Sequence, residues 1–296
     1  MKALTWLEPI LINRSPLEPL PTHVTPELKK LRDVRAVVFD VYGTLIVSGS
    51  GDVGSVDETD RSLVMRRALA EAGVQDFVLN EISWNGLRCV ISQMNQVRSN
   101  EHCVSPEVDI IAAWRDLLDS NGWSVSDQAI SDVVRLATRF ESMANPTWPM
   151  PGAADLIQQL HSREICLGIV SNAQVFTTLL VDDLTIPKKN NEPVFQHDLC
   201  FFSNRFRHSK PGPRMFDALA QSLQRRNILP QEAIYVGNDM LNDVWAAKQI
   251  GMRTAWYAGD RRSARRREED SRCGELSADL ILTSLPQLLE LSLIHI

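Results

Sequence analysis

The sequence predicts a doubly wound α/β fold with a mostly parallel sheet. Short apolar runs recur along the chain, and each stops at small or charged polar residues. Such runs are typical of buried strands, whereas the stretches between them carry apolar residues at the helical spacings of three and four. Open α/β sheets place their chemistry at the carboxyl ends of the strands. The polar residues that end the runs are therefore the candidate functional residues.

The first strand is predicted within the segment 36–45, whose apolar run stops at Asp40 and a glycine turn. Asp40 then emerges at the edge of the sheet, where its carboxylate is a candidate nucleophile. The alternative is an aspartate that only caps a turn, and this segment taken alone favours that alternative. The polar residues at the ends of the other strands favour the interpretation of Asp40 as a nucleophile over that of a turn cap.

Two more strand ends carry groups that can bind an anion. The apolar run 165–170 stops at Ser171 and Asn172, whose side chains can donate hydrogen bonds. A third strand is predicted over 199–203, and Lys210 follows it ahead of a helical pattern. A lysine before proline is usually a solvated loop residue, but one aimed at the entrance of a helix is a good phosphate partner.

A fourth strand, predicted over 233–237, is followed by the carboxylates of Asp239 and Asp243. Clustered oxygen ligands near a phosphate suit Mg²⁺, which prefers one or two carboxylates with water and substrate oxygens. The alternative is that Asp243 caps the helix expected over 244–250. Because Asn238 directly precedes Asp239, either of the two can hold the first position of this motif.

In this order, the four strand ends resemble the motifs of the haloacid dehalogenase superfamily of aspartate-nucleophile hydrolases. The resemblance covers residues 34–290 and implies a Rossmann-like core. It implies that Asp40 forms a covalent intermediate while Ser171 and Lys210 bind the transferring group. The chemistry agrees, because a carboxylate that attacks an anionic centre needs its own charge neutralised by a cation.

The resemblance also implies the remaining site residues. The substrate-binding residues are Thr44, Ser171, Asn172 and Lys210, and the Mg²⁺ ligands are Asp40, the backbone carbonyl of Tyr42, Asp239 and Asp243. The expected cofactor is therefore Mg²⁺, and the expected partner is a small anionic molecule.

Tyr42 departs from the phosphatase pattern. Phosphatases of this superfamily usually carry a second aspartate there, two residues after the nucleophile, which protonates the leaving group and later activates water. A tyrosine resembles the 2-haloacid dehalogenase branch instead, whose halide leaving group needs no proton. That branch uses no metal and typically carries serine and asparagine in the fourth motif, whereas this chain keeps Asp239 and Asp243.

We therefore expect a Mg²⁺-dependent hydrolase that acts on a small phosphomonoester. One alternative is a metal-independent hydrolase of the 2-haloacid dehalogenase type. Another, from a different class, is a binding or regulatory protein with weak turnover. The sequence names neither the substrate nor the oligomeric state, because fold alone does not determine specificity.

The chain divides into three predicted parts. Residues 1–33 form a proline-rich extension with a short helix over 26–31, and the catalytic core comprises 34–54 and 146–290. Residues 55–145 show helical patterns, which the resemblance identifies as an all-helical cap inserted after the first motif. These patterns cover 60–72, 84–97, 108–121 and 127–143. Caps of this kind close over the site and exclude water.

Two sets of cap residues are ambiguous. Trp84, Trp114 and Trp123 could bind a substrate, but aromatic residues at helical spacing more often pack in a core. Arg88, Asn95 and Arg98 share a helical sector that would meet an anionic substrate if it faced the site. We expect packing for the tryptophans and an ordinary solvated face for the arginines.

Composition narrows the range of functions. The net charge of −6 argues against nucleic-acid binding, since that affinity depends on concentrated positive charge. The basic run 261–267 is followed at once by three acidic residues, so a solvated loop is the favoured interpretation. No apolar run approaches the roughly 18 residues of a membrane span. The five cysteines include no CxxC pair, and we expect a cytoplasmic protein without membrane association.

Overall fold

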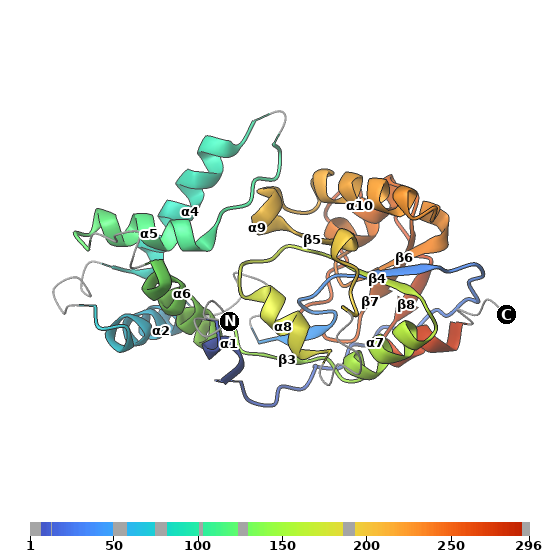
Figure 1. Cartoon of the computed structure of the whole chain (residues 1–296), viewed down its shortest axis with the longest axis horizontal. Helices are drawn as coiled ribbons and strands as arrows, with labels where there is room; N and C mark the ends of the chain where they lie inside the picture. Colours follow the sequence, from blue (N-terminus) through green and yellow to red (C-terminus); the bar gives the residue numbers. More distant parts are fainter. Residues whose placement is uncertain are drawn as a thin grey trace.

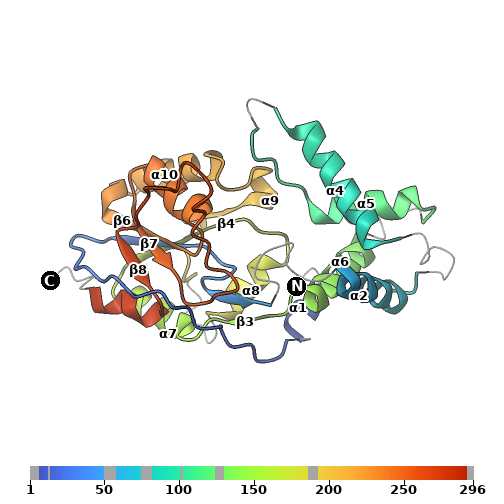
Figure 2. The ribbon, with the colours of Figure 1, turned by 180° about the vertical axis from the view of Figure 1, so that it is seen from behind.

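The computed structural model describes residues 7–12, 14–49, 58–74, 82–100, 103–123, 130–185 and 193–291. These residues form two lobes, one built on a sheet and one made of helices (Figures 1 and 2). Among them, no helix is both long and apolar enough to cross a membrane. The five cysteines are all free.

The sheet lobe contains six strands that all pair in parallel. In spatial order these are β5 (Cys200–Phe202), β4 (Cys166–Ser171), β1 (Ala36–Phe39), β6 (Ala233–Gly237), β7 (Arg253–Tyr257) and β8 (Leu280–Leu282). The chain builds outward from β1 to β5 on one side and then crosses to β6 on the other. The strand order therefore reverses between β1 and β6, and such a reversal is where α/β proteins bind ligands.

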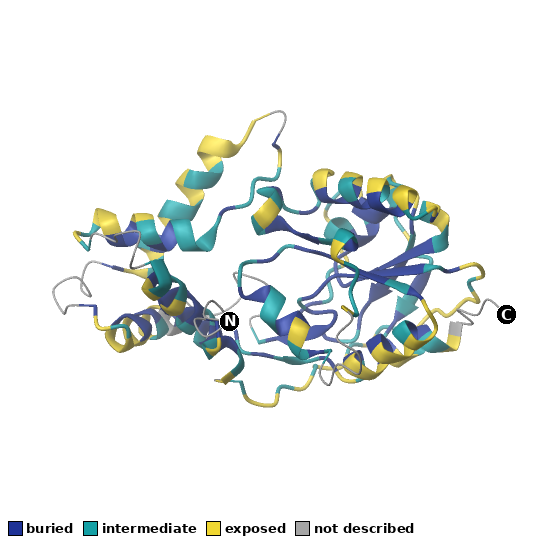
Figure 3. Ribbon diagram, in the orientation of Figure 1, coloured by how far each residue is buried: buried dark blue, intermediate teal, exposed yellow. Residues whose placement is uncertain are grey.

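Helices cover both faces of this sheet, as the alternation of residues along β1 requires. Val37 and Phe39 belong to a core cluster with α7 (Ala153–Ser162) and α8 (Thr177–Asp183). Ala36 and Val38 belong to a separate cluster on the opposite face, with α10 (Arg214–Arg225). Figure 3 shows the buried strands between these layers. The predicted doubly wound, mostly parallel α/β class is confirmed.

The second lobe consists of helices that fall within a few residues of the predicted ones. They are α2 (Glu58–Glu71), α4 (Trp84–Arg98), α5 (Ile110–Ser120) and α6 (Ile130–Ala144). Their apolar faces form a core of their own, which includes Leu69, Trp114, Leu118 and Leu136. The helical lobe therefore does not depend on the sheet for its buried centre.

The connections between the lobes run through a small antiparallel pair, β2 (Ile46–Ser48) and β3 (Thr147–Pro149). The amide of Gly49 extends the pair by donating to the carbonyl oxygen of Pro146 at 2.8 Å. The predicted boundary between residues 54 and 55 lies outside the described residues.

The helix predicted over 26–31 is wrong. This segment is extended, and Glu27 exchanges two backbone hydrogen bonds, of 2.9 and 3.0 Å, with Ile281 of β8. Because β8 is the last strand of the sheet, its free edge offers backbone partners to any neighbouring chain segment. This long-range pairing overrides the weak local helix preference. The N-terminal extension thereby covers the edge of the sheet.

Candidate active site

Asp40 directly follows β1, beside the point where the strand order reverses. Its amide continues the sheet ladder by donating to the carbonyl oxygen of Val236 at 2.9 Å. The chain then turns through Gly43, whose φ of +77° favours glycine. A Cβ at Gly43 would lie 2.4 Å from Cβ of Ser263, so the close packing of this turn also excludes a side chain. The glycine turn therefore fixes where the Asp40 carboxylate emerges.

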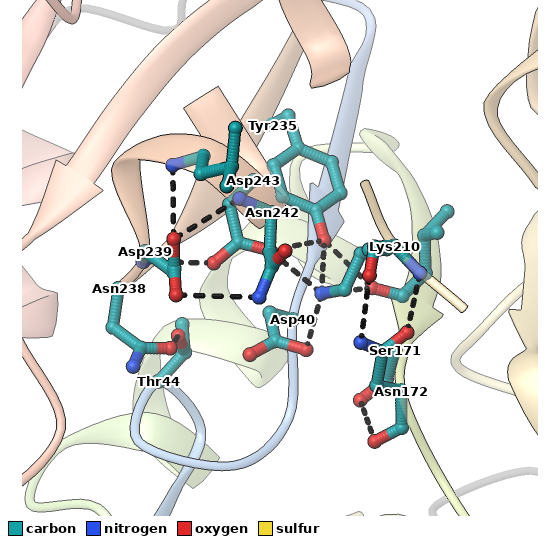
Figure 4. A network of polar contacts seen from close by, with 12 residues as sticks. Asp40, Thr44, Ser171, Asn172, Lys210, Tyr235, Asn238, Asp239, Asn242 and Asp243 are labelled. Carbon is teal, nitrogen blue, oxygen red and sulfur yellow. Dashed lines mark hydrogen bonds and ion pairs between the residues drawn. The ribbon is translucent and has the colours of Figure 1, made fainter. Parts of the chain in front are cut away.

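Lys210 is at the centre of the polar network in Figure 4. Its ammonium group donates to Oδ1 of Asp40 at 2.8 Å and to Oδ1 of Asp243 at 2.6 Å. It also contacts the carbonyl oxygen of Val170 and the hydroxyl of Tyr235, both at 3.1 Å. Burial would lower the pKa of Lys210, but the charges and hydrogen bonds of the two aspartates outweigh it and raise the pKa. The lysine is therefore held as a cation against Asp40.

Asp243 is the most deeply buried carboxylate of the site, with 1% of the residue exposed. Burial raises the pKa of Asp243, while the charge of Lys210 acts in the opposite direction. Its Oδ2 accepts a hydrogen bond from the amide of Asp239 at 2.9 Å. Asp243 thus faces the interior of the site and does not cap the following helix.

Tyr235 is a site residue that the sequence did not indicate. Its hydroxyl donates to the carbonyl oxygen of Val170 at 2.6 Å and accepts from Lys210. It also lies 3.2 Å from Oδ1 of Asp243. The available signal was a hydroxyl-bearing side chain within the apolar run 233–236, since a buried tyrosine hydroxyl needs a polar partner.

Asp239, rather than Asp243, caps the helical segment that follows β6. Its Oδ1 accepts from the amides of Leu241 and Asn242, at 2.9 and 3.0 Å. Its Oδ2 accepts from Nε and Nη2 of Arg267, at 3.0 and 2.7 Å. The alternative interpretation, in which Asp243 caps the helix, therefore named the wrong aspartate. The basic run also takes part in the site through Arg267, so the interpretation of a solvated loop is incomplete.

Asn238 connects the first-motif turn to the loop of the basic run. Its Oδ1 accepts from Oγ1 of Thr44 at 3.1 Å, and its Nδ2 donates to the carbonyl oxygen of Ser263 at 2.6 Å. Thr44 is fully buried by this arrangement. Asn238 and Asp239 therefore occupy distinct places, one against the turn and one at the helix terminus.

The end of β4 positions the segment that carries Lys210. The side-chain amide of Asn172 accepts from the Lys210 amide at 2.7 Å and donates to the Lys210 carbonyl oxygen at 3.3 Å. Ser171 is fully buried, and its hydroxyl donates to the carbonyl oxygen of Asn172 at 3.4 Å. The side-chain amide of Asn172 thus holds the backbone of Lys210 in place from the end of β4. This strand lies two places along the sheet from β6, the strand that precedes Asp243.

The surroundings of Tyr42 do not suit a role in acid–base catalysis. Its hydroxyl lies 3.0 Å from Oγ1 of Thr177 on α8. Burial raises the pKa of Tyr42, and the negative charges of Glu141 and Asp40 raise it further. The phenol is therefore neutral at physiological pH and is a poor proton carrier.

A cavity of about 440 Å³ joins this network to the helical lobe. Of the predicted site residues, Asp40, Tyr42, Asn172, Lys210, Asp239 and Asp243 line it, whereas Thr44 and Ser171 are not among its lining residues. The helical lobe contributes an aromatic and charged wall of Arg61, Trp84, Trp114, Phe140 and Glu141. Trp84 and Trp114 pack as expected, against Phe140, and in addition face the cavity. Arg88 and Arg98 are exposed and do not line it, as expected.

The comparisons with known proteins agree with this arrangement. A family model described as haloacid dehalogenase-like hydrolase matches residues 34–251, so the chain belongs to that family of hydrolases. Phosphoglycolate phosphatase of Escherichia coli K12 is 25% identical over 232 residues, which cover 76% of this chain and 81% of the relative. The predicted superfamily is thereby confirmed.

Two further similarities extend the comparison. Glyceraldehyde 3-phosphate phosphatase of Pyrococcus furiosus is 29% identical over 147 residues, which cover 48% of this chain and about half, 53%, of the relative. The crystal structure of 2-haloacid dehalogenase from Pseudomonas syringae pv. Tomato DC3000 superposes with a TM-score of 0.59 at 21% identity, covering 87% of this chain and 97% of that chain. The second similarity supports the fold.

Proposed function

We propose that the protein is a Mg²⁺-dependent phosphatase that hydrolyses a small phosphomonoester with Asp40 as the nucleophile. The observation that carries this proposal is the buried Lys210 ammonium group between Asp40 and Asp243 at the carboxyl edge of the sheet. The two relatives named as phosphatases support this function over dehalogenation.

The hydrogen bonds of Asp40 assign its two oxygens different tasks. Oδ1 accepts from Lys210, whereas no described residue donates to Oδ2. Oδ2 is therefore the oxygen available for attack on phosphorus. The bond from Oδ2 to phosphorus forms as the ester P–O bond breaks, and the leaving alkoxide takes up a proton from solvent water to become the alcohol. Water then attacks phosphorus, which releases inorganic phosphate and regenerates the carboxylate.

The donor set fits a hard divalent cation. The carbonyl oxygen of Tyr42 has no described hydrogen-bond donor, and Asp40 and Asp243 supply two buried carboxylates. These groups, with Asp239 once Arg267 releases it, would hold Mg²⁺. The bound ion would supply positive charge to neutralise the phosphoryl oxygens.

Lys210 acts beside such an ion by keeping Asp40 in place and by offsetting its charge. The Asp40 carboxylate must approach an anionic phosphoryl group, and the two negative charges repel each other. A fixed cation that weakens this repulsion lowers the activation barrier of the attack. The two aspartates raise the pKa of Lys210, which favours its protonated form. We therefore assign Lys210 no proton transfer in the reaction.

The experiment is a substrate panel assayed for two products. The purified protein is incubated with phosphorylated metabolites and with short 2-haloacids, with Mg²⁺ or after exhaustive chelation, and phosphate and halide are measured. The proposal expects phosphate release that needs Mg²⁺. Tyr42 favours the dehalogenase as the second candidate, and that function predicts halide release that chelation does not change. Absence of turnover on every compound supports the binding or regulatory protein.

A further inference from the structure

Arg61 of α2 is a cation in the cavity wall that the proposed reaction does not use. It lines the same cavity as Asp40 and Lys210, although it comes from the helical lobe. Its guanidinium carbon lies 4.8 Å from the centre of the Trp84 ring, and the residue is only 5% exposed. The guanidinium group therefore packs against the Trp84 ring at the wall.

Nε of Arg61 is buried, and no described residue accepts a hydrogen bond from it. A buried donor without an acceptor destabilises the protein, so most such atoms find a partner. Trp114 lines the same cavity, and no described residue accepts from its buried Nε1 either. Both groups are donors only, so the partner that satisfies them must carry acceptor atoms.

The charge of Arg61 is not cancelled by an ion pair within the described residues. Glu141 acts on it from the same wall, but the two side chains make no ion pair. Oε1 of Glu141 instead accepts from Nδ2 of Asn145 at 3.1 Å, and Oδ1 of Asn145 accepts from Ser48 at 2.7 Å. Burial raises the pKa of Glu141 and lowers the pKa of Arg61, while the charge of each side chain favours the charged form of the other. The guanidinium therefore retains the capacity to bind an anion.

Apart from Arg61, Glu107, Glu141 and Asn145, the surface that the helical lobe gives the cavity is apolar. It is formed by Trp84, Leu87, Ile91, Ala137 and Phe140. A cavity of about 440 Å³ falls within the usual range of small-ligand sites, roughly 300–1,000 Å³. It therefore accepts a molecule that extends from the aspartate network across apolar surface to the helical lobe.

We propose that the substrate is a phosphomonoester whose opposite end carries a carboxylate, and that Arg61 binds this carboxylate. The inference rests on the proposed function, because it takes the Asp40 end of the cavity as the phosphoryl site. It assigns Arg61 as the residue that determines which phosphate esters are preferred. The carboxylate pairs with the guanidinium of Arg61, whose side chain lines the cavity.

The test measures binding without chemistry. Phosphonates have a P–C bond in place of the ester bond, so the protein cannot hydrolyse them by the proposed route. A series of ω-carboxyalkyl phosphonates is compared with the matched carboxamide and alkyl phosphonates by calorimetry in the presence of Mg²⁺. We expect the best carboxylate to bind at least about tenfold more tightly than its alkyl counterpart, with the neutral amide between them.

Arg67 provides a matched control on the same helix. Its side chain is 72% exposed, and it pairs with Glu71 at 3.0 Å. Arg61→Met should bring the ratio of the affinities for the carboxylate and alkyl phosphonates close to one. Arg67→Met, which removes the same charge, should keep the wild-type ratio. Arg61→Lys should keep an intermediate preference. Thermal unfolding establishes that each variant is folded before its affinity is interpreted.

The outcomes separate the two proposals. Wild-type binding that shows no preference for the carboxylate overturns this inference, as do equal affinities for carboxylate and amide, no binding of any phosphonate, or a preference that survives Arg61→Met. If Arg61→Met does not fold, the wild-type comparison and Arg61→Lys decide by the same criteria. A carboxylate preference that depends on Arg61, in a protein that releases no phosphate from any ester, contradicts the proposed function and leaves the Arg61 site supported.

Discussion

Nζ of Lys210 lies 2.6 Å from Oδ1 of Asp243, and the two side chains are 3% and 1% exposed. Asp40 adds a second carboxylate at 2.8 Å from the same nitrogen. Two aspartates are thus gathered around one buried cation. Removing one member of a buried ion pair is costly, because the remaining charge loses its compensation.

Lys210→Met should therefore destabilise the metal-free protein by about 3–5 kcal/mol. The methionine leaves Asp40 and Asp243 near one another without the ammonium between them. Adding Asp243→Asn to this variant should recover part of the loss. The measurement is the free energy of unfolding in urea with a chelator present.

Lys248→Met is the control for this comparison. Lys248 pairs with Asp279 at 3.1 Å, but both side chains are more than a quarter exposed. A pair of this kind contributes less than about 1 kcal/mol. If Lys210→Met costs no more than Lys248→Met, the lysine does not hold the two aspartates together.

Arg267→Met should increase the affinity for Mg²⁺ by about tenfold, or about 1.4 kcal/mol. The Arg267 guanidinium now binds Oδ2 of Asp239, a proposed metal ligand, so guanidinium and metal compete for one oxygen. Calorimetric titration with Mg²⁺ measures the change directly. Arg261→Met removes the same charge at an exposed position of the same run and should leave the affinity near that of the wild type. Equal affinities of the two variants would show that Asp239 is not a ligand.

Tyr42→Asp should increase kcat/KM for an alkyl phosphate much more than for an aryl phosphate. An aryl leaving group departs without a proton, whereas an alkyl alcohol needs one. General acid–base assistance is worth about a hundredfold to ten-thousandfold, although loss of the ring packing will offset part of it. Tyr42→Asn, which removes the ring without adding a carboxyl group, should show no such selectivity. Equal gains on both esters would mean that another residue already moves the proton.

The parts of the fold that the sequence predicted are those that local pattern determines. Apolar runs that end in polar residues predicted the strands and the edge at which Asp40, Lys210 and Asp243 meet. The helical lobe was also predicted, because residues three and four apart lie on one face of a helix. In contrast, the extended segment around Glu27 depends on a partner some 250 residues away, at Ile281.

The site residues that sequence reasoning missed are those whose roles arise from contacts distant in the chain. Tyr235 appeared to be an ordinary strand residue until the fold placed its hydroxyl against Lys210. Arg267 belonged to a run whose acidic neighbours offered nearer partners, yet it pairs with Asp239. No motif contains Arg61; its proposed role depends on its place in the cavity wall and on its Nε, from which no described residue accepts a hydrogen bond.

The most direct test of the covalent mechanism is the rate of phosphate release by Asp40→Asn, measured beside the wild type on the best ester of the panel. The amide is nearly isosteric with the carboxylate but is a far poorer nucleophile, so the fold should persist while the rate falls by on the order of a thousandfold or more. A variant that is folded and retains more than about a tenth of the wild-type rate would contradict attack by Asp40.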